Sequence, residues 1–196
     1  MTVTDVPGFV ASGLACGVKP SGDPDMAMVA TADGRPVTAV GVFTSNKMTA
    51  APVRVCREHL AGTGGRAAAV VINSGNANAA TGAQGMADAE AMCALTAAEL
   101  GCAPEEVLVC STGWIGYGLP MDAISAGIPR LAGSLDPDGG PAAAMVAGAD
   151  DMGGGGDAVM EGLLTLHAAR PGGRAVIGGC GHGGGAVREP ASRRGE

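Results

Sequence analysis

The sequence predicts an α/β fold, because two stretches each combine a buried strand with a following amphipathic helix. In residues 70–100 an apolar run precedes apolar positions at three- and four-residue spacing, and residues 107–131 repeat that order. The chain has 196 residues, enough for one domain with a sizeable core. Hydrophobic residues make up 46% of the chain and aromatic residues only 2%, so the core must be aliphatic.

Charge and hydropathy disfavour several classes of partner. The formal net charge is −7 and the basic residues form no patch, which argues against binding to nucleic acid or anionic membranes. No run approaches the roughly 18 apolar residues of a membrane helix. The N-terminus also lacks the basic start and apolar run of a signal peptide. We therefore expect a cytoplasmic protein.

The cysteines and histidines show no metal-binding pattern. The six cysteines form no C-x-x-C pair and several lie in apolar runs, so we expect buried free thiols. His59 has no aspartate or cysteine at ligand spacing. We expect it on the surface near the end of a short helix, and we predict no metal site.

The N-terminal part is predicted to hold a hairpin of two strands. Residues 1–7 are expected to be a flexible tail, and residues 8–135 the core. Gly17–Gly22 has the composition of a loop, and Asp25–Thr31 the pattern of a strand. Val37–Phe43 is expected to return antiparallel to that strand across a short turn.

A turn dense in asparagine and glycine follows the apolar run Ala67–Ile72. Residues 73–79 are Asn-Ser-Gly-Asn-Ala-Asn-Ala, and a helix is predicted over Gly85–Leu100, ended by Gly101. Asparagine and glycine tolerate left-handed backbone angles, and asparagine side chains bond nearby backbone groups. On physical grounds alone this stretch is a strand-to-helix turn without chemistry.

A second strand, Val107–Cys110, runs into Ser-Thr-Gly-Trp-Ile-Gly at residues 111–116. Backbone amides and a hydroxyl at one point can hold the negative charge that develops on a tetrahedral intermediate of acyl transfer. On spacing alone, an ordinary glycine turn after a buried strand is the favoured interpretation. The helix predicted next, Met121–Leu131, is expected to be interrupted at Gly127 and Pro129.

These motifs resemble the ornithine acetyltransferase family, the glutamate N-acetyltransferases of arginine biosynthesis. The resemblance rests on residues 73–79 with Thr81-Gly82, on residues 111–116, and on the loop Gly17–Gly22. It covers residues 8 to about 131 and is a resemblance to the α chain of these self-processing enzymes. It implies a layered αββα sandwich that is incomplete without a β chain.

The resemblance also implies a reaction. Acetyl would move from N-acetylornithine to glutamate by a ping-pong mechanism, through an acyl group on the N-terminal threonine of the β chain. Thr112 and Gly113 would form the oxyanion hole. No bound cofactor is implied, although acetyl-CoA can serve as an acetyl donor, and the complete assembly would be α2β2.

The last third of the chain departs from the family pattern. Residues 136–186 are a divergent glycine-rich segment, and residues 187–196 are expected to be a disordered tail. Only Asp150 corresponds to the family's threonine-rich substrate segment, and the family lysine falls on His182, which does not reproduce an ammonium group. Both are candidate substrate-binding residues. No threonine in the last residues fits the self-cleavage point.

Other functions stay open. The chain can instead be a truncated, non-catalytic relic or binding subunit of the same fold, or part of a related self-processing amide hydrolase or aminopeptidase. An unrelated α/β protein whose glycine turns bind an anion is a further alternative. Without a β chain, strand edges and apolar surface would be exposed, so the isolated chain is expected to be marginally stable or to associate.

Overall fold

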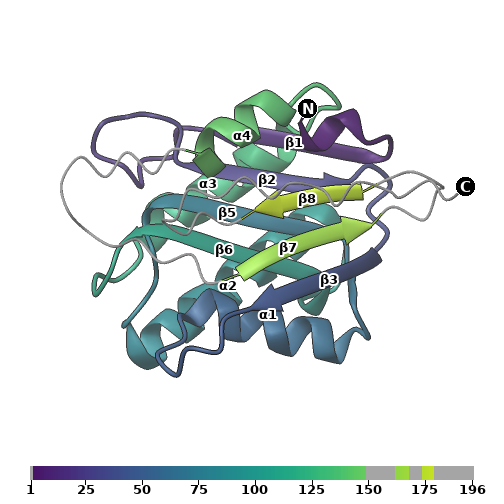
Figure 1. Ribbon diagram of the computed structural model, residues 1–196. Coiled ribbons are helices and arrows are strands. Elements are labelled where there is room, and N and C mark those ends of the chain that lie inside the picture. The colour runs from purple at the N-terminus through teal and green to yellow at the C-terminus, as the bar shows by residue number, and fades with distance from the viewer. Residues whose placement is uncertain (1, 149–161, 168–173, 179–196) are drawn as a thin grey trace, which may run out of the picture.

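The computed structural model describes residues 2–148, 162–167 and 174–178, which form two four-stranded sheets with helices around them (Figure 1). The first sheet has the order β1-β2-β5-β6 and comprises β1 (Phe9–Leu14), β2 (Met26–Thr31), β5 (Ala69–Asn76) and β6 (Val107–Trp114). The second has the order β4-β3-β7-β8 and comprises β3 (Val37–Phe43), β4 (Arg66–Ala67), β7 (Gly162–His167) and β8 (Arg174–Gly178). The predicted α/β class is confirmed.

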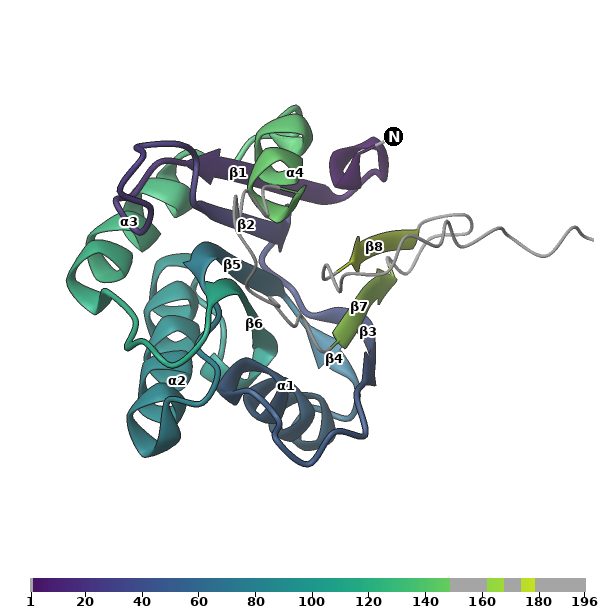
Figure 2. The ribbon, with the colours of Figure 1, turned by 60° about the vertical axis from the view of Figure 1, so that its left-hand side comes forward.

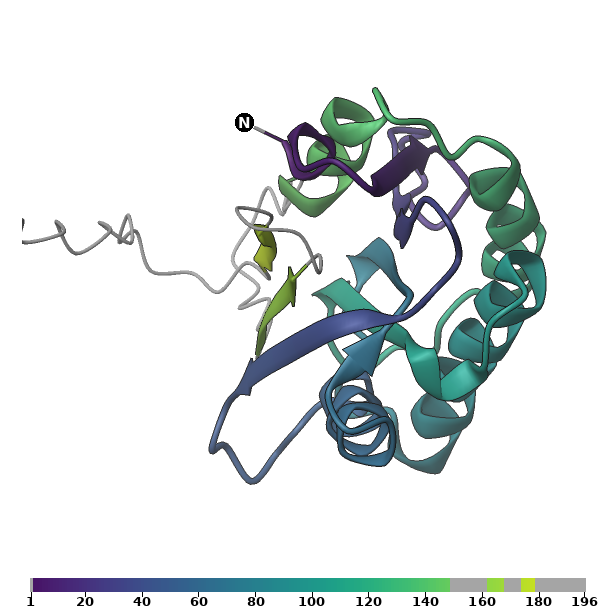
Figure 3. The same cartoon turned by 90° about the vertical axis from the view of Figure 1, so that its right-hand side faces the viewer.

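The helices are α1 (Ala51–Gly62), α2 (Gly82–Leu100), α3 (Met121–Gly133) and α4 (Gly140–Gly148), with short 3-10 helices η1 (Val3–Asp5) and η2 (Pro104–Glu106). Helices α2 and α3 lie side by side on one face of the first sheet, and the second sheet lies beyond the opposite face (Figures 2 and 3). The layers therefore follow one another as helices, first sheet and second sheet. This order agrees with the predicted layered sandwich.

Helix α4 covers the face of β1 that α3 leaves open. Ser12 donates from its hydroxyl to the carbonyl oxygen of Leu131 in α3, at 2.9 Å. A Cβ at the next residue, Gly13, would lie 2.2 Å from the carbonyl oxygen of Ala142 in α4. Because neighbouring strand residues point to opposite faces, the two helices lie on opposite sides of β1.

Strands β5 and β6 are joined through α2, in the order that the sequence predicted, and the structure shows that they pair in parallel. Both run further than expected. β5 continues to Asn76 rather than ending at Ile72, and β6 continues to Trp114 rather than Cys110. The reason is that residues 73–76 pair with residues 111–114, so the two polar motifs extend the ladder and the turn begins after it.

The predicted hairpin of β2 and β3 is wrong. β2 pairs with β1 on one edge and β5 on the other, whereas β3 pairs with β4 and β7 in the second sheet. All residues of β2 are buried, so it requires cover on both faces and neighbours on both edges. β3 exposes alternate residues, which is typical of a strand with one solvated face.

Two local expectations also differ from the structure. Helix α3 continues through Gly127 and Pro129 without interruption. Gly127 is needed there, because a Cβ would lie 2.7 Å from the sulfur of Cys16, and Pro129 lies on the exposed side of the helix. At the N-terminus, the segment expected to be a tail contains η1, where the Asp5 carboxylate accepts the backbone N–H of Thr2 at 2.7 Å.

Helix α1 closes the free edge of β6. The Cys56 thiol donates to the carbonyl oxygen of Val109 at 3.2 Å, and the Val109 N–H donates to the same sulfur at 3.4 Å. His59 Nδ1 lies 2.7 Å from the carbonyl oxygen of Val107. These side chains pair backbone groups that an edge strand would otherwise leave open. His59 is near the end of a short helix, as expected, but it is half-buried rather than on the surface.

The core is aliphatic, as predicted. Its largest fully buried side chains include Met26, Met28, Met92, Leu108, Ile124, Ile128 and Leu131. Cys56 and Cys93 are buried free thiols, which confirms that expectation for these two residues. No helix within the described ranges has the length and apolar character to span a bilayer.

Candidate functional site

The two polar motifs lie side by side at the carboxyl ends of β5 and β6. The parallel register places Gly75 opposite Gly113, although the two are far apart in the sequence. Together β5, α2 and β6 form a βαβ unit. Open α/β sheets bind their ligands just beyond the carboxyl ends of such strands, so this is the edge of the sheet where a site is expected.

Residue 113 must be glycine for two reasons, its backbone conformation and the lack of room for a Cβ atom. Its φ is +130°, a value that L side chains rarely adopt. A Cβ there would lie 2.2 Å from the carbonyl carbon of Gly75 and 2.4 Å from the nitrogen of Asn76. At Gly75, with a φ of +105°, a Cβ would lie 2.9 Å from Cγ of Lys19. The absent side chains therefore let two strand ends and a loop approach one another, next to the buried Thr112.

Asparagine side chains fix the turn that leaves β5. Asn76 donates through Nδ2 to the carbonyl oxygens of Gly118 at 2.9 Å and Tyr117 at 3.2 Å. Its Oδ1 accepts the backbone N–H of Asn78 at 2.9 Å, and Asn78 donates to the carbonyl oxygen of Gly85 in α2 at 2.8 Å. The predicted bonding of asparagine side chains to nearby backbone is confirmed, and it also ties the loop after β6 to β5.

A buried carboxylate that the sequence patterns do not mark organises the loop before β2. Asp25 is fully buried and accepts the backbone N–H groups of four successive residues, 16–19, at distances between 2.7 and 3.0 Å. Successive amides that converge on one anion fix the loop conformation. The carbonyl oxygen of Asp25 accepts the N–H of Ser74 at 2.8 Å, which joins this loop to β5.

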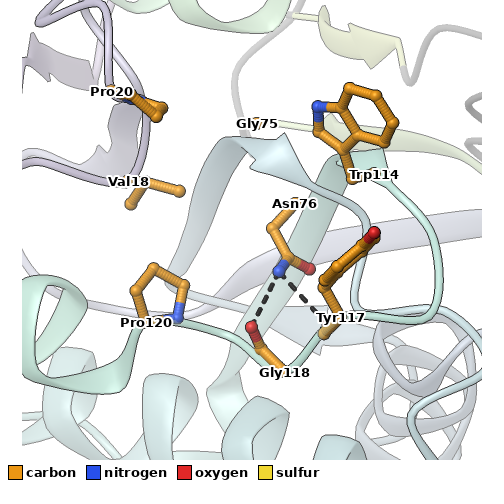
Figure 4. A pocket seen from close by; sticks show the side chains of 8 residues that line it. All are labelled: Val18, Pro20, Gly75, Asn76, Trp114, Tyr117, Gly118 and Pro120. Carbon is orange, nitrogen blue, oxygen red and sulfur yellow. Dashed lines mark hydrogen bonds between the residues drawn. The ribbon is translucent and has the colours of Figure 1, made fainter.

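A cavity of about 410 Å³ lies between this loop and the loop after β6 (Figure 4). Trp114 and Tyr117 stand on one side, with ring centroids 6.3 Å apart and ring planes at 86°. They are the only tryptophan and the only tyrosine of the chain, and both are more than half exposed. The full lining is Val18, Pro20, Gly75, Asn76, Trp114, Tyr117, Gly118 and Pro120.

Comparison with known proteins identifies the family. The ArgJ family model matches residues 10–187, which is most of the chain. The chain belongs to the ArgJ family. The arginine biosynthesis bifunctional protein ArgJ of Parasynechococcus marenigrum is 40% identical over 185 residues, 94% of this chain and 43% of the relative. That of Thermosynechococcus vestitus is 45% identical over 150 residues, 76% of this chain and 35% of the relative. The chain thus spans less than half the length of these curated relatives.

Solved structures agree with this assignment. An ornithine acetyltransferase from Mycobacterium tuberculosis, solved in complex with ornithine, has a TM-score of 0.74 and 33% identity, and the match covers 94% of this chain and 95% of that chain. The ArgJ protein of Bacillus halodurans has a TM-score of 0.70 and 31% identity, covering 97% and 93%. The resemblance that the sequence motifs indicated is confirmed.

The predicted site residues of this ArgJ-family chain divide into two groups. Thr112 and Gly113 lie at the end of β6, beside the cavity. Asp150 and His182 lie outside the described residues. Among the residues that the structure describes, no group of three or more His, Cys, Asp or Glu side chains is placed to hold a metal ion.

The sequence analysis did not single out Asp25 or the aromatic pair as parts of one site. The aromatic pair did have a signal in the sequence. In a chain with so few aromatic residues, its only tryptophan and tyrosine stand three positions apart, directly after the Ser-Thr-Gly motif. Asp25 had no comparable signal, because Asp23 precedes it in the same acidic loop.

Proposed function

We propose that this chain is the α part of an acetyltransferase that moves acetyl from N-acetylornithine to glutamate. The supporting observation is the pairing of β5 with β6, which brings Gly113 against Gly75 with Thr112 buried beside it. Membership of the ArgJ family supports the same reaction, since its relatives are named as arginine biosynthesis proteins and a structural neighbour as an ornithine acetyltransferase.

In this proposal a β chain supplies an N-terminal threonine as the nucleophile. Its hydroxyl oxygen attacks the acetyl carbonyl carbon of N-acetylornithine, while its own α-amine takes the hydroxyl proton. A C–O bond forms and the carbonyl electron pair moves onto oxygen. The Thr112 hydroxyl and the Gly113 N–H donate hydrogen bonds to that oxyanion. On collapse the C–N bond breaks, and the ornithine amine leaves with the proton.

The second half of the reaction reverses these steps with glutamate. The glutamate amine attacks the acetyl-threonine ester, the same donors stabilise the second oxyanion, and N-acetylglutamate leaves as the threonine hydroxyl is restored. We propose Asp150 and His182 as substrate-binding residues and acetyl-CoA as an alternative donor in the first half. The complete assembly would be α2β2, in the cytoplasm.

Intact-mass spectrometry of the protein purified from its native host tests for the β chain. The expected result is a co-purifying polypeptide that begins with threonine, in a complex that transfers acetyl from N-acetylornithine to glutamate. A chain that purifies alone and lacks transfer activity would contradict the proposal and favour a non-catalytic subunit. Release of acetate without any dependence on glutamate would favour an amide hydrolase.

Replacement of Thr112 tests the oxyanion role. In the complex, Thr112→Val should lower kcat about 10²- to 10³-fold, because one donor to the oxyanion is lost. Thr96→Val is the matched control, since Thr96 is also buried but lies in α2, and its hydroxyl has no hydrogen-bond partner among the described residues. If the two variants have equal activity, Thr112 does not act on the reacting carbonyl.

A further inference from the structure

The cavity between the loops lies next to the residues proposed to hold the oxyanion. Trp114 follows Gly113 directly in the chain, and Gly75, which lines the cavity, is the residue that Gly113 touches. The cavity is also at the carboxyl ends of the parallel strands, where α/β sheets bind small molecules. A group attached to the reacting carbonyl carbon would therefore have this space beside it.

The walls of the cavity favour an uncharged ligand. Val18, Pro20 and Pro120 face the rings of Trp114 and Tyr117 across it (Figure 4). The lining residues, all of them in the described part of the chain, include no Asp, Glu, Lys, Arg or His. A charged group placed here would find no ionic partner among these lining residues, whereas an apolar group would cover their apolar surface.

The amide side chain in the lining, that of Asn76, already makes hydrogen bonds within the protein. Both hydrogens of Asn76 Nδ2 are directed to carbonyl oxygens of the loop after β6, and its Oδ1 accepts a backbone N–H. Asn76 thus holds the cavity wall in place rather than offering its amide hydrogens to a ligand. The amino-acid head groups of ornithine and glutamate, which carry both charges, do not match this lining.

The cavity is also much larger than an acetyl group. Its volume of about 410 Å³ is within the range of small-molecule pockets. One water molecule occupies roughly 30 Å³ in the liquid, so the three heavy atoms of acetyl would leave most of the space empty. Removing apolar walls of this extent from water is favourable, and a ligand does so only if it is large enough to cover them with apolar surface of its own.

We propose that this cavity binds the apolar part of an acyl group larger than acetyl, so that the chain accepts longer acyl donors. The inference deepens the proposed function and rests on it for the position of the carbonyl. The ligand class is an N-acylated amino acid whose acyl chain fills the space between Val18, Pro20 and the Trp114–Tyr117 pair. The charged amino-acid part lies outside the cavity.

Fluorescence of Trp114 provides a direct test, because no other tryptophan occurs in the chain. The full chain is titrated with N-acetyl-, N-butanoyl-, N-hexanoyl- and N-octanoylornithine, which differ only in acyl length. The expected result is an affinity that rises by up to about fourfold for each methylene buried. Affinity that does not depend on chain length would overturn the proposal.

A cavity-filling variant gives the matched comparison. A Cβ at Gly118 would meet no atom within 4 Å, so Gly118→Leu adds a side chain at the cavity wall without a clash at its Cβ. It should reduce the ratio of hexanoyl to acetyl affinity by tenfold or more. Gly62→Leu is the control, because Gly62 also has open space but lies at the end of α1, outside the cavity. Equal ratios in the two variants would overturn the proposal.

The binding and transfer measurements separate this inference from the function on which it rests. A chain-length dependence that Gly118→Leu removes, in a protein without acetyl transfer, supports the cavity and contradicts the transferase. Acetyl transfer with no preference for longer acyl groups supports the transferase and overturns the inference about the cavity.

Discussion

Gly113 combines a positive φ with backbone neighbours too close for a Cβ atom. Gly113→Ala should destabilise the fold by at least about 3 kcal/mol, because its Cβ would overlap the Gly75 and Asn76 backbone at an unfavourable φ. Urea unfolding followed by circular dichroism measures this. Gly116→Ala separates the two causes, since Gly116 has a φ of +84° but open space, and should cost only about 1–2 kcal/mol. Equal losses would show that overlap is not the cause.

The Asp25 carboxylate stabilises its loop by accepting hydrogen bonds from four backbone N–H groups. Asp25→Asn should lower the free energy of unfolding by about 2–3 kcal/mol, because one Asp25 oxygen accepts three of the four N–H groups and an amide nitrogen cannot accept the fourth. Thermal unfolding provides the measurement. The exposed Asp23→Asn, two positions away, should change stability by less than about 0.5 kcal/mol. A shift of similar size in both variants would contradict the role assigned to Asp25.

At this scale the sequence predicted the asparagine turn, because that turn depends on local chemistry at fixed spacing. Thr112 and Gly113 were assigned to an oxyanion hole from the resemblance to the family, since their spacing alone also fits an ordinary glycine turn. It did not reveal Asp25, since acceptance of four amides depends on how the loop folds back on the carboxylate. Nor did it reveal that Trp114 faces Val18 across a cavity, because Trp114 ends β6 and Val18 lies in the loop before β2, and only the tertiary structure brings them together.

Among the elements, β5, α2 and β6 were predicted with their order and type, because apolar periodicity marks them clearly. The strand ends were not, since Ser, Thr, Asn and Gly resemble turn residues until a parallel partner pairs with them. The hairpin prediction failed for a related reason. Chain proximity favours pairing of β2 with β3, but the complete burial of β2 places it between β1 and β5.

The contact of α1 with the edge of β6 makes Cys56 structurally important. Cys56→Ala should cost about 2–3 kcal/mol, because the buried Val109 N–H and carbonyl groups both lose the sulfur as a partner. Chemical denaturation at pH 7 tests this. Cys102→Ala, at a half-buried thiol, should cost less than half as much. Indistinguishable midpoints for the two variants would show that the thiol does not stabilise the strand edge.

The buried thiols should make the folded state less stable at alkaline pH. Burial raises the pKa of Cys56 to about 11 and raises the pKa of Cys93 well above its usual value. Below a pH of about 8.5 the thiols are protonated in both states and their contribution to stability is complete. Above it the unfolded chain releases protons first, so the free energy of unfolding falls by up to about 1.4 kcal/mol per pH unit per thiol, until the folded pKa is passed. Urea midpoints at pH 7.5, 9 and 10 should decline, and less steeply in Cys56→Ala.

For the whole molecule, the layers follow from where apolar surface must be covered. The first sheet has helices α2 and α3 on one face, and its other face looks toward α4 and the second sheet (Figure 2). On β3 of the second sheet, Val40 is 50% and Val42 63% exposed. These two valines lie two positions apart and so share one side of β3, where they form an exposed apolar face to which another chain can bind.

The isolated chain should therefore associate through this face. We expect light scattering coupled to size-exclusion chromatography to show species larger than the monomer mass of 18.9 kDa at micromolar concentration. The double variant Val40→Thr/Val42→Thr keeps β-branched residues that suit a strand but removes the apolar face, so it should shift the protein toward monomer. Met48→Thr is the control, because Met48 is 78% exposed but lies outside the second sheet. An isolated chain that stays monomeric and unfolds cooperatively would contradict both the association and the need for a covering chain.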